Sequence, residues 1–283
     1  MIVLTVANQK GGVGKTTSTA SLGHYFALAG IKTLIIDLDG QGHVARILGM
    51  EKGSGLYSLL VLGCPLAEAI TPGRENLHVV TNDHNAERVK AHVAGAMMRE
   101  FILADILADA PYQLVLLDTP PSTDALHISA LVAADYLLIP SIMDDLALDG
   151  VGAILNTTRA LGRYSGVTPP ALIGILPTMF DKTTGETQAN ITRLAQALGS
   201  DVILPPVPRD TKIREAAATG KTVWEYAPNC QGAIGYPNGT GKVHNPVNRV
   251  GGYLHVAEIA ARMMGLEAEM HVKRPVTYSQ RGA

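Results

Sequence analysis

Cysteine is scarce in this chain: Cys64 and Cys230 stand far apart among 283 residues and form no C-x-x-C pair. So few cysteines build no disulfide framework, and we expect free thiols in a reducing cytoplasm. No apolar run reaches the roughly 18 residues of a transmembrane helix. The first strand pattern begins at Ile2, so we also expect no signal peptide. The nine histidines show no clustered ligand spacing, which argues against a transition-metal site.

Excess charge of one sign is also missing. The net charge is −2, which by itself argues against a generally basic nucleic-acid binder. The charges are unevenly spread, however. Residues 1–158 hold 9 Lys and Arg against 16 Asp and Glu (−7), and residues 159–283 hold 14 against 9 (+5). Such an asymmetry marks either a polyanion-binding face or solvated helix surfaces, and the sequence leaves both open.

Strand-like apolar runs alternate with helix-like segments along most of the chain. The predicted strands are Ile2–Ala7, Lys32–Asp37, Leu77–Thr81, Gln113–Asp118, Tyr136–Pro140, Ala171–Leu176 and Asp201–Val207. The predicted helices are Thr16–Ala29, Ala86–Leu107, Ala125–Ala133, Leu146–Leu161, Glu186–Leu198 and Ile213–Ala218. Continuous apolar strands are typical of a sheet covered on both faces. The pattern predicts an α/β fold with a single doubly wound, mainly parallel sheet and helices on both faces.

The chain shows no internal repeat and no linker that would split it, so we expect a single domain over residues 1–270. The segment Asn229–Arg249 interrupts the pattern with four glycines, two prolines and four asparagines, and we expect an inserted loop there. A final helix is predicted at Gly252–Met264. Residues 271–283 are expected to form a polar, disordered tail.

A glycine-rich loop carries the strongest functional signal. Residues 8–17 read N-Q-K-G-G-V-G-K-T-T between a predicted strand and a predicted helix, the setting that a phosphate-binding loop requires. The helix start favours an anion, which backbone N–H groups of the loop would bind. Those groups belong to Gly11, Gly12, Val13 and Gly14. Lys15 is expected to reach the β- and γ-phosphates, and the Thr16 hydroxyl to bind Mg²⁺. Gln9 stands where the common pattern has its first glycine, and a second lysine, Lys10, follows it.

Two predicted strands end in carboxylates. Asp37 and Asp39 close one strand and Asp118 closes another. Open α/β sheets bind ligands at this carboxyl edge. Asp118 is therefore expected to hold the Mg²⁺ shell through water, and the stiff segment Thr119–Pro121 to form a switch that senses the γ-phosphate. Either carboxylate alone is equally consistent with a simple strand cap. Combined with the loop, they predict a nucleotide-hydrolysing site.

These motifs resemble those of the ParA/MinD-type ATPases, the deviant Walker A branch of the phosphate-loop proteins, and most closely its ParA branch. K-G-G-V-G-K-T-T at 10–17 matches the family loop, D-L-D-G-Q-G at 37–42 resembles D-x-D-P-Q-G, and D-T-P-P-S at 118–122 resembles D-x-P-P-S. L-P-T-M-F-D at 176–181 and the segment 207–221 resemble later family motifs. The resemblance runs from residue 1 to about residue 228 and resumes at Gly251.

The resemblance implies a slow, Mg²⁺-dependent ATPase that forms a homodimer around ATP. Lys10 would cross the dimer interface to the partner subunit's ATP, as an arginine finger does, and would be unpaired until it meets a phosphate. Thr17 would bind the α-phosphate, Asp39 would position the attacking water, and Asp37 would support Mg²⁺ and the switch. The residues implied near the adenine are Met179, Pro208 and Arg209.

The implied function is partition or positioning. The ATP-bound dimer would bind DNA without sequence preference, and a ParB-like or adaptor protein would stimulate hydrolysis and release it. The cargo would be plasmid DNA, chromosomal DNA or a protein assembly, and the protein would be cytoplasmic and nucleoid-associated. The basic residues expected to contact DNA phosphates are Lys182, Arg209, Lys212, Arg214 and Lys221.

Three alternatives stand beside this interpretation. A MinD-like membrane-cycling ATPase needs a C-terminal amphipathic helix, which the proline-containing tail at 271–276 does not supply, so no membrane partner is expected. A metal-cluster relative needs paired cysteines. A ligase-type enzyme that phosphorylates a small substrate stays open, because the loop alone does not exclude it.

Three positions depart from the family pattern. Gly40 replaces a proline, which predicts a looser first switch. Ile142 stands where glutamine is common, and Asp210 where asparagine is usual.

Overall fold

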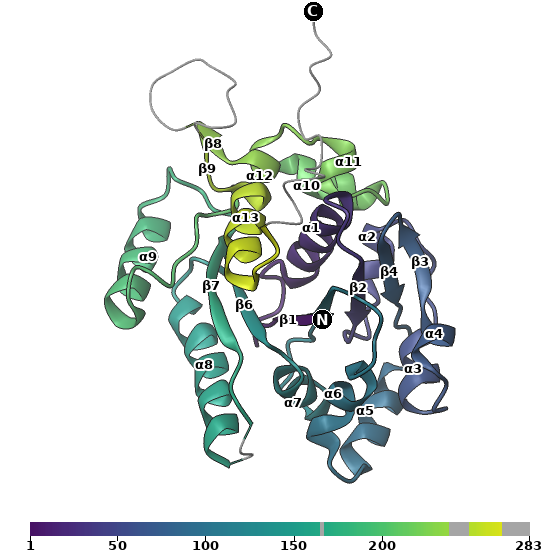
Figure 1. Ribbon diagram of the computed structural model, residues 1–283. Helices are drawn as coiled ribbons and strands as arrows, with labels where there is room; N and C mark the ends of the chain where they lie inside the picture. Colours follow the sequence, from purple (N-terminus) through teal and green to yellow (C-terminus); the bar gives the residue numbers. More distant parts are fainter. Residues whose placement is uncertain (165–166, 238–248, 268–283) are drawn as a thin grey trace, which may run out of the picture.

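The computed structural model describes residues 1–164, 167–237 and 249–267 (Figure 1). Among them, seven strands form one sheet in the order β3-β4-β2-β5-β1-β6-β7, and β3 alone runs antiparallel to its neighbour. These strands are β1 (Ile2–Val6), β2 (Thr33–Asp37), β3 (Thr71–Arg74), β4 (Leu77–Val80), β5 (Leu114–Asp118), β6 (Tyr136–Ile142) and β7 (Ala171–Thr178). The predicted α/β fold with one mainly parallel sheet is confirmed.

Helices cover both faces of the sheet (Figure 1). They are α1 (Lys15–Leu28), α2 (His43–Ile47), α3 (Gly55–Leu60), α4 (Leu66–Ala69), α5 (Ala86–Gly95), η1 (Arg99–Phe101), α6 (Ile102–Leu107), α7 (Ala125–Val132), α8 (Ala147–Tyr164), α9 (Gly185–Leu198), α10 (Thr211–Ala218), α11 (Val223–Tyr226), α12 (Gln231–Ile234) and α13 (Gly252–Met264). The structure confirms the predicted final helix. Within the described residues, no helix combines the length and apolarity needed to cross a membrane.

Alternate residues of each strand face opposite layers of the core. In β2, Ile35 packs with α1 and α13, while Leu34 and Ile36 pack with α3, α5, α6 and α7. A third apolar cluster joins β6 and β7 to α8 and α9. This double covering explains why the central strands read as continuous apolar runs. It also leaves the carboxyl ends of β1, β2 and β5 together at one edge of the sheet.

The prediction of a regular strand at Asp201–Val207 is wrong. The segment runs beside β7 but makes only isolated bridges, Ile203 to Ile175 and Pro208 to Phe180. Pro205 and Pro206 lack the N–H groups that a continuous ladder needs. The segment is therefore hydrogen-bonded to β7 at intervals, as between the Leu204 N–H and the Ile175 carbonyl at 2.9 Å, without forming a continuous strand.

The prediction of one continuous helix at Ala86–Leu107 is also wrong. It breaks after Gly95, where Ala96 is extended and Met98 takes a left-handed φ of 52°. Glycine is a poor helix former and commonly stands at a helix end.

Part of the loop expected at Asn229–Arg249 lies within the described residues. It contains α12 and a short antiparallel pair, β8 (Tyr236–Pro237) with β9 (Arg249–Val250). Residues 238–248 and the expected tail at 271–283 lie outside the described residues.

Two glycines let separate parts of the chain approach closely. Gly49 follows α2 with φ of 65°, and a Cβ on it would lie 2.7 Å from the Gly220 carbonyl oxygen. Gly220, after α10, has φ of 68°. A side chain at either position would be strained and would push α2 and α10 apart.

We therefore predict that Gly49→Ala lowers the free energy of unfolding by about 1–3 kcal/mol. Urea denaturation checks this, with Gly152→Ala in α8 as the matched control. Gly152 has nothing within 4 Å of a built Cβ, so its replacement should be neutral or stabilise the helix by up to about 1 kcal/mol. Equal effects of the two substitutions would contradict the close-approach account.

Candidate nucleotide-binding site

The glycine-rich loop connects β1 to the first turn of α1. Gly12 and Gly14 take left-handed φ values of 74° and 86°, which orient the loop around the helix start. Val13 is buried, and its carbonyl accepts a hydrogen bond of 2.8 Å from the Thr178 hydroxyl. The Lys15 ammonium donates to the Lys10 carbonyl at 3.0 Å and so curls back across the loop. The sequence here forms the anion-binding geometry that its pattern predicts.

A cavity of about 520 Å³ opens over this loop. Its floor is formed by the loop and the first turn of α1, and the lining residues there are Gly11, Gly12, Gly14, Lys15, Thr16 and Thr17. Asp39 and Pro121 lie on its wall, and α2 adds His43 and Arg46. The structure therefore brings the predicted phosphate-binding residues together with the two predicted switch segments.

A second cavity, of about 400 Å³, shares Gly14, Thr17 and Met179 with the first. Pro208 and Arg209 also line it, so the residues expected near the adenine are adjacent. Sequence reasoning missed other lining residues, which are Thr178, Ile213, Ala217 and Tyr253. Met179 is 42% exposed and has a left-handed φ of 49°. Such strain in a residue without glycine's freedom is typical of binding sites.

The acidic residues lie behind the loop. Asp37 and Asp118 are paired neighbours at the ends of β2 and β5, and both side chains are fully buried. Asp37 accepts backbone N–H bonds from Asp39 at 3.1 Å and from Val44 at 3.2 Å, so it ties the end of β2 to the start of α2. Asp118 accepts a 3.0 Å bond from the Thr19 hydroxyl.

Burial disfavours the charged forms of these groups. It raises the pKa of Asp118 to about 7, against hydrogen bonds from Thr16 and Thr19 and the Lys15 charge. Burial and the neighbouring Asp118 raise the pKa of Asp37 well above its usual range. Burial lowers the pKa of Lys15, although Asp118 and Asp39 act against the shift. Burial thus removes these three ionisable groups from water, and the surrounding protein solvates their charged forms poorly.

The donor set fits Mg²⁺. The second carboxylate oxygen of Asp118, Oδ2, is buried without a hydrogen-bond partner in the described parts of the chain. Thr16, whose side chain acts to lower the pKa of Asp118 by hydrogen bonding, offers a hydroxyl oxygen as a second ligand. Among the residues described, no three His, Cys, Asp or Glu side chains are arranged to hold a metal ion unaided. Mg²⁺ is commonly held in this way, by one or two protein oxygens, substrate phosphates and water.

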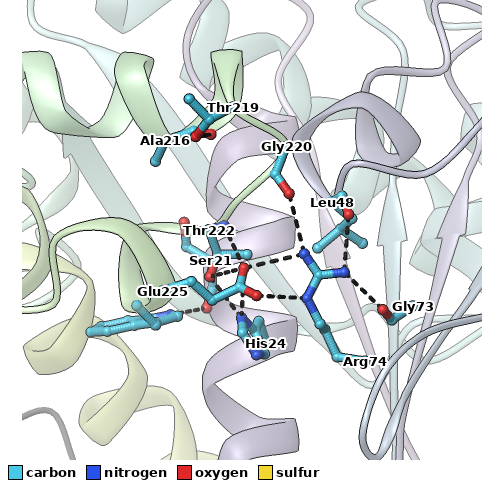
Figure 2. Close-up of polar contacts among 11 residues, drawn as sticks. Ser21, His24, Leu48, Gly73, Arg74, Ala216, Thr219, Gly220, Thr222 and Glu225 are labelled. Carbon is cyan, nitrogen blue, oxygen red and sulfur yellow. Dashed lines mark hydrogen bonds and ion pairs between the residues drawn. The ribbon is translucent and has the colours of Figure 1, made fainter.

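An arginine clamp fixes the outer wall of the cavity (Figure 2). Arg74 pairs with Glu225 through Nε at 2.7 Å and also donates to the carbonyls of Leu48 at 3.0 Å and Gly220 at 3.2 Å. Glu225 in turn accepts from the Thr222 N–H at 2.8 Å, completing the cap of α11. One side chain thus links the end of α2 to the loop after α10. Both helices line the nucleotide cavity.

The five residues expected to contact DNA have different surroundings. Arg214 lines both cavities and Arg209 lines the second. Lys212 pairs with Glu215 at 2.7 Å. Lys182 lies 4.8 Å from the centre of the Tyr236 ring. Lys221 is exposed beyond α10.

Two contacts bear on the expectations for the phosphate loop and the first switch, which were an unpaired Lys10 and a loose segment at Gly40. Lys10 is not unpaired, because its ammonium forms an ion pair with Asp144 in the loop after β6. A Cβ on Gly40 would lie 2.3 Å from Cβ of Ala86, so the start of α5 packs against this glycine. No local pattern marks Asp144 as a lysine partner, because the contact joins positions 134 residues apart.

A phosphate-binding loop between β1 and α1, at the carboxyl edge of a parallel sheet with buried acidic strand ends, defines a phosphate-loop nucleotide hydrolase. A family model described as an AAA domain matches residues 1–166. The chain is 36% identical to the chromosome-partitioning ATPase Soj of Thermus thermophilus, over 82% of this chain and 91% of that protein. It is 32% identical to the chromosome partitioning protein ParA of Caulobacter vibrioides, over 83% and 90%.

Solved structures agree with these relatives. A structure described as cobyrinic acid a,c-diamide synthase of Mycobacterium smegmatis, with bound ATP analog and magnesium, matches with a TM-score of 0.69 and 30% identity, covering 78% of this chain and 91% of that one. The chain therefore belongs to the ParA/MinD-type ATPases. It is an ATPase of the partition or positioning class.

The raised pKa of Asp118 predicts that Asp118→Asn stabilises the folded chain by an amount that depends on pH. The folded pKa of about 7 lies above the ordinary 3.8, so the folded chain holds the extra proton and loses stability as the pH rises through this window. At pH 8, Asp118→Asn should stabilise the nucleotide-free chain by roughly 2–4 kcal/mol, and the gain should vanish near pH 4. ATP hydrolysis should be lost.

Thermal and urea denaturation across this pH range measure the effect. Asp109→Asn is the matched control, because Asp109 is exposed. An Asp118→Asn variant less stable than the wild type at pH 8 would contradict the account.

Proposed function

We propose that this ATPase is a switch in which ATP joins two copies of the chain and the joined form binds DNA without sequence preference. The position of Lys10 carries the proposal. Its side chain is not among the residues lining the cavity over its own loop. It is instead paired with Asp144 at the surface, where the two side chains are 27% and 34% exposed. A partly exposed ion pair contributes at most about 1 kcal/mol, so a partner's phosphate can displace Asp144.

The surface around this ion pair suits contact with a second copy. Asp144 accepts the Leu146 N–H at 3.1 Å, and the Leu146 side chain is 58% exposed. Leu148, in the first turn of α8, is 39% exposed. Exposed apolar side chains beside a displaceable ion pair favour a contact that forms and dissociates.

Within each subunit, we assign the chemistry to the residues around the loop. Lys15 and the loop N–H groups bind the phosphates, Thr16 and Asp118 hold Mg²⁺ directly or through water, and Thr17 contacts the α-phosphate. Asp39, on the cavity wall, positions the attacking water. Asp37 supports the metal and holds the switch through its two backbone bonds. Bound Mg²⁺ supplies charge neutralisation for the leaving phosphate.

The second cavity takes the base in this proposal, between Met179 and the Pro208–Arg209 segment. Arg209 and Arg214 line cavities, so we assign them to the nucleotide before DNA. The exposed Lys221 supports a DNA-facing role more directly. A DNA-bound or adaptor partner that stimulates hydrolysis would release the complex, and the protein would be nucleoid-associated in the cytoplasm.

Retention on non-specific DNA tests this function. The wild type should be retained at low salt with ATP but not with ADP, and retention should fall steeply as salt rises. Lys10→Ala should bind ATP normally yet lose at least about 90% of the retained fraction, because it cannot join a second copy. Lys32→Ala is the matched control, since Lys32 lies before β2 at the opposite edge of the sheet. Retention without ATP, or equal retention of Lys10→Ala, would contradict the proposal.

A further inference from the structure

Asn8 is a buried polar residue at the point where the chain leaves β1 and enters the phosphate loop. Backbone contact between this part of the chain and β6 extends to the Ala7 N–H, which donates to the Leu138 carbonyl at 3.1 Å. Beyond that point the Asn8 side chain continues the contact, because its Nδ2 donates to the Pro140 carbonyl at 2.8 Å. A side-chain amide thus attaches the start of the loop to β6.

The oxygen of the same amide holds the backbone of Lys10. Asn8 Oδ1 accepts the Lys10 N–H at 2.9 Å, and the Lys10 carbonyl accepts the Lys15 ammonium at 3.0 Å. Both backbone polar groups of Lys10 are therefore held within the subunit. The Lys10 side chain is 27% exposed, so the ammonium lies toward the surface while the backbone that carries it is fixed.

Close packing from α8 keeps the amide in place. A Cβ on Gly150, in the first turn of α8, would lie 3.1 Å from Asn8 Oδ1, which is closer than an ordinary van der Waals contact. The segment between β6 and α8 also carries Asp144, which pairs with the Lys10 ammonium. Asn8 therefore joins the backbone of Lys10 to the part of the chain that holds the Lys10 side chain.

We propose that Asn8 is a positioning residue that sets the direction in which Lys10 leaves the loop, and thereby aims its ammonium at the nucleotide of a second copy. A lysine side chain is a flexible four-carbon stem, so the region that its ammonium reaches depends on where the backbone is fixed. One hydrogen bond of Asn8 fixes that backbone, and the other attaches it to the sheet. This inference rests on the proposed function, in which Lys10 acts on the ATP of the partner.

Mixtures of variants test the inference, because they separate the lysine that a chain gives from the lysine that it receives. Asn8→Ala alone should hydrolyse ATP at about one tenth of the wild-type rate or less, while its affinity for ATP stays within about twofold. Mixing it with Asp39→Ala should restore hydrolysis, because the Asn8→Ala chain keeps its own cavity and receives a correctly placed Lys10. Mixing it with Lys10→Ala should not, because neither chain then gives such a lysine.

A purely structural role for Asn8 gives the opposite result. If its loss deformed the cavity of its own chain, that chain would still give Lys10, and it would restore hydrolysis to Lys10→Ala but not to Asp39→Ala. That result would overturn the inference, as would restoration by neither variant or a wild-type rate for Asn8→Ala alone. Failure of the proposed function would appear separately, because Lys10→Ala and Asp39→Ala would then not restore each other.

Gly150→Ala tests the inference with the amide still present, and decides it if Asn8→Ala does not fold. Its methyl group would press against Asn8 Oδ1, so hydrolysis should fall about twofold to fivefold, with restoration by Asp39→Ala and not by Lys10→Ala. Gly152→Ala is the matched control in the same helix, since nothing lies within 4 Å of a built Cβ. Equal rates for the two glycine variants would contradict the inference.

Thr5→Val controls for the loss of a buried hydrogen bond at β1. The Thr5 hydroxyl donates to the Ala130 carbonyl at 2.8 Å, and valine keeps its shape without the donor. This variant should lower the melting temperature without slowing hydrolysis. If it slows hydrolysis as much as Asn8→Ala does, the loss reflects packing around β1 and the inference is wrong.

Discussion

Buried charge at one edge of the sheet is the constraint on which the site depends. Asp37 and Asp118 lie side by side at the ends of β2 and β5, fully buried, and Lys15 faces them from the first turn of α1. Isolated charges are costly at such positions, and burial raises the pKa of both carboxyl groups. In the proposed function, Mg²⁺ and a nucleoside triphosphate would supply opposite charges to both sets of groups. The protein therefore holds in its free form an electrostatic cost that ligand binding relieves.

The rest of the fold keeps these groups at the edge and ties the surrounding walls to it. The apolar clusters on both faces of the sheet fix β1, β2 and β5. The outer walls are attached by the Arg74–Glu225 clamp (Figure 2) and by the close approach of Gly49 to Gly220. The Lys10 ammonium is held by its partly exposed ion pair with Asp144. The carboxylates at the centre are buried at the ends of β2 and β5, whereas the Lys10–Asp144 pair lies at the partly exposed rim.

The sequence predicts the parts of this arrangement that depend on local pattern. Continuous apolar runs, the glycine loop and the carboxylates at strand ends identify the sheet, the cavity floor and Asp118, because each property is encoded within a few neighbouring residues. The broken edge at Asp201–Val207 was predictable from Pro205 and Pro206, whose missing N–H groups outweigh the apolar pattern. The Lys10–Asp144 pair and the Arg74 clamp were not predictable. These contacts join residues from distant segments or depend on burial, which only the folded chain defines.

In the proposed function, each nucleotide site is completed by Lys10 from a second copy of the chain. ATP hydrolysis by a mixture of two variants tests this arrangement directly. Lys10→Ala keeps Asp39 and its own cavity, whereas Asp39→Ala keeps Lys10. In a mixed dimer the second chain supplies its Lys10 to the intact cavity of the first. The account predicts that each variant alone hydrolyses ATP poorly and that mixing them restores hydrolysis well above the sum of the separate rates. A mixed rate equal to that sum would contradict it.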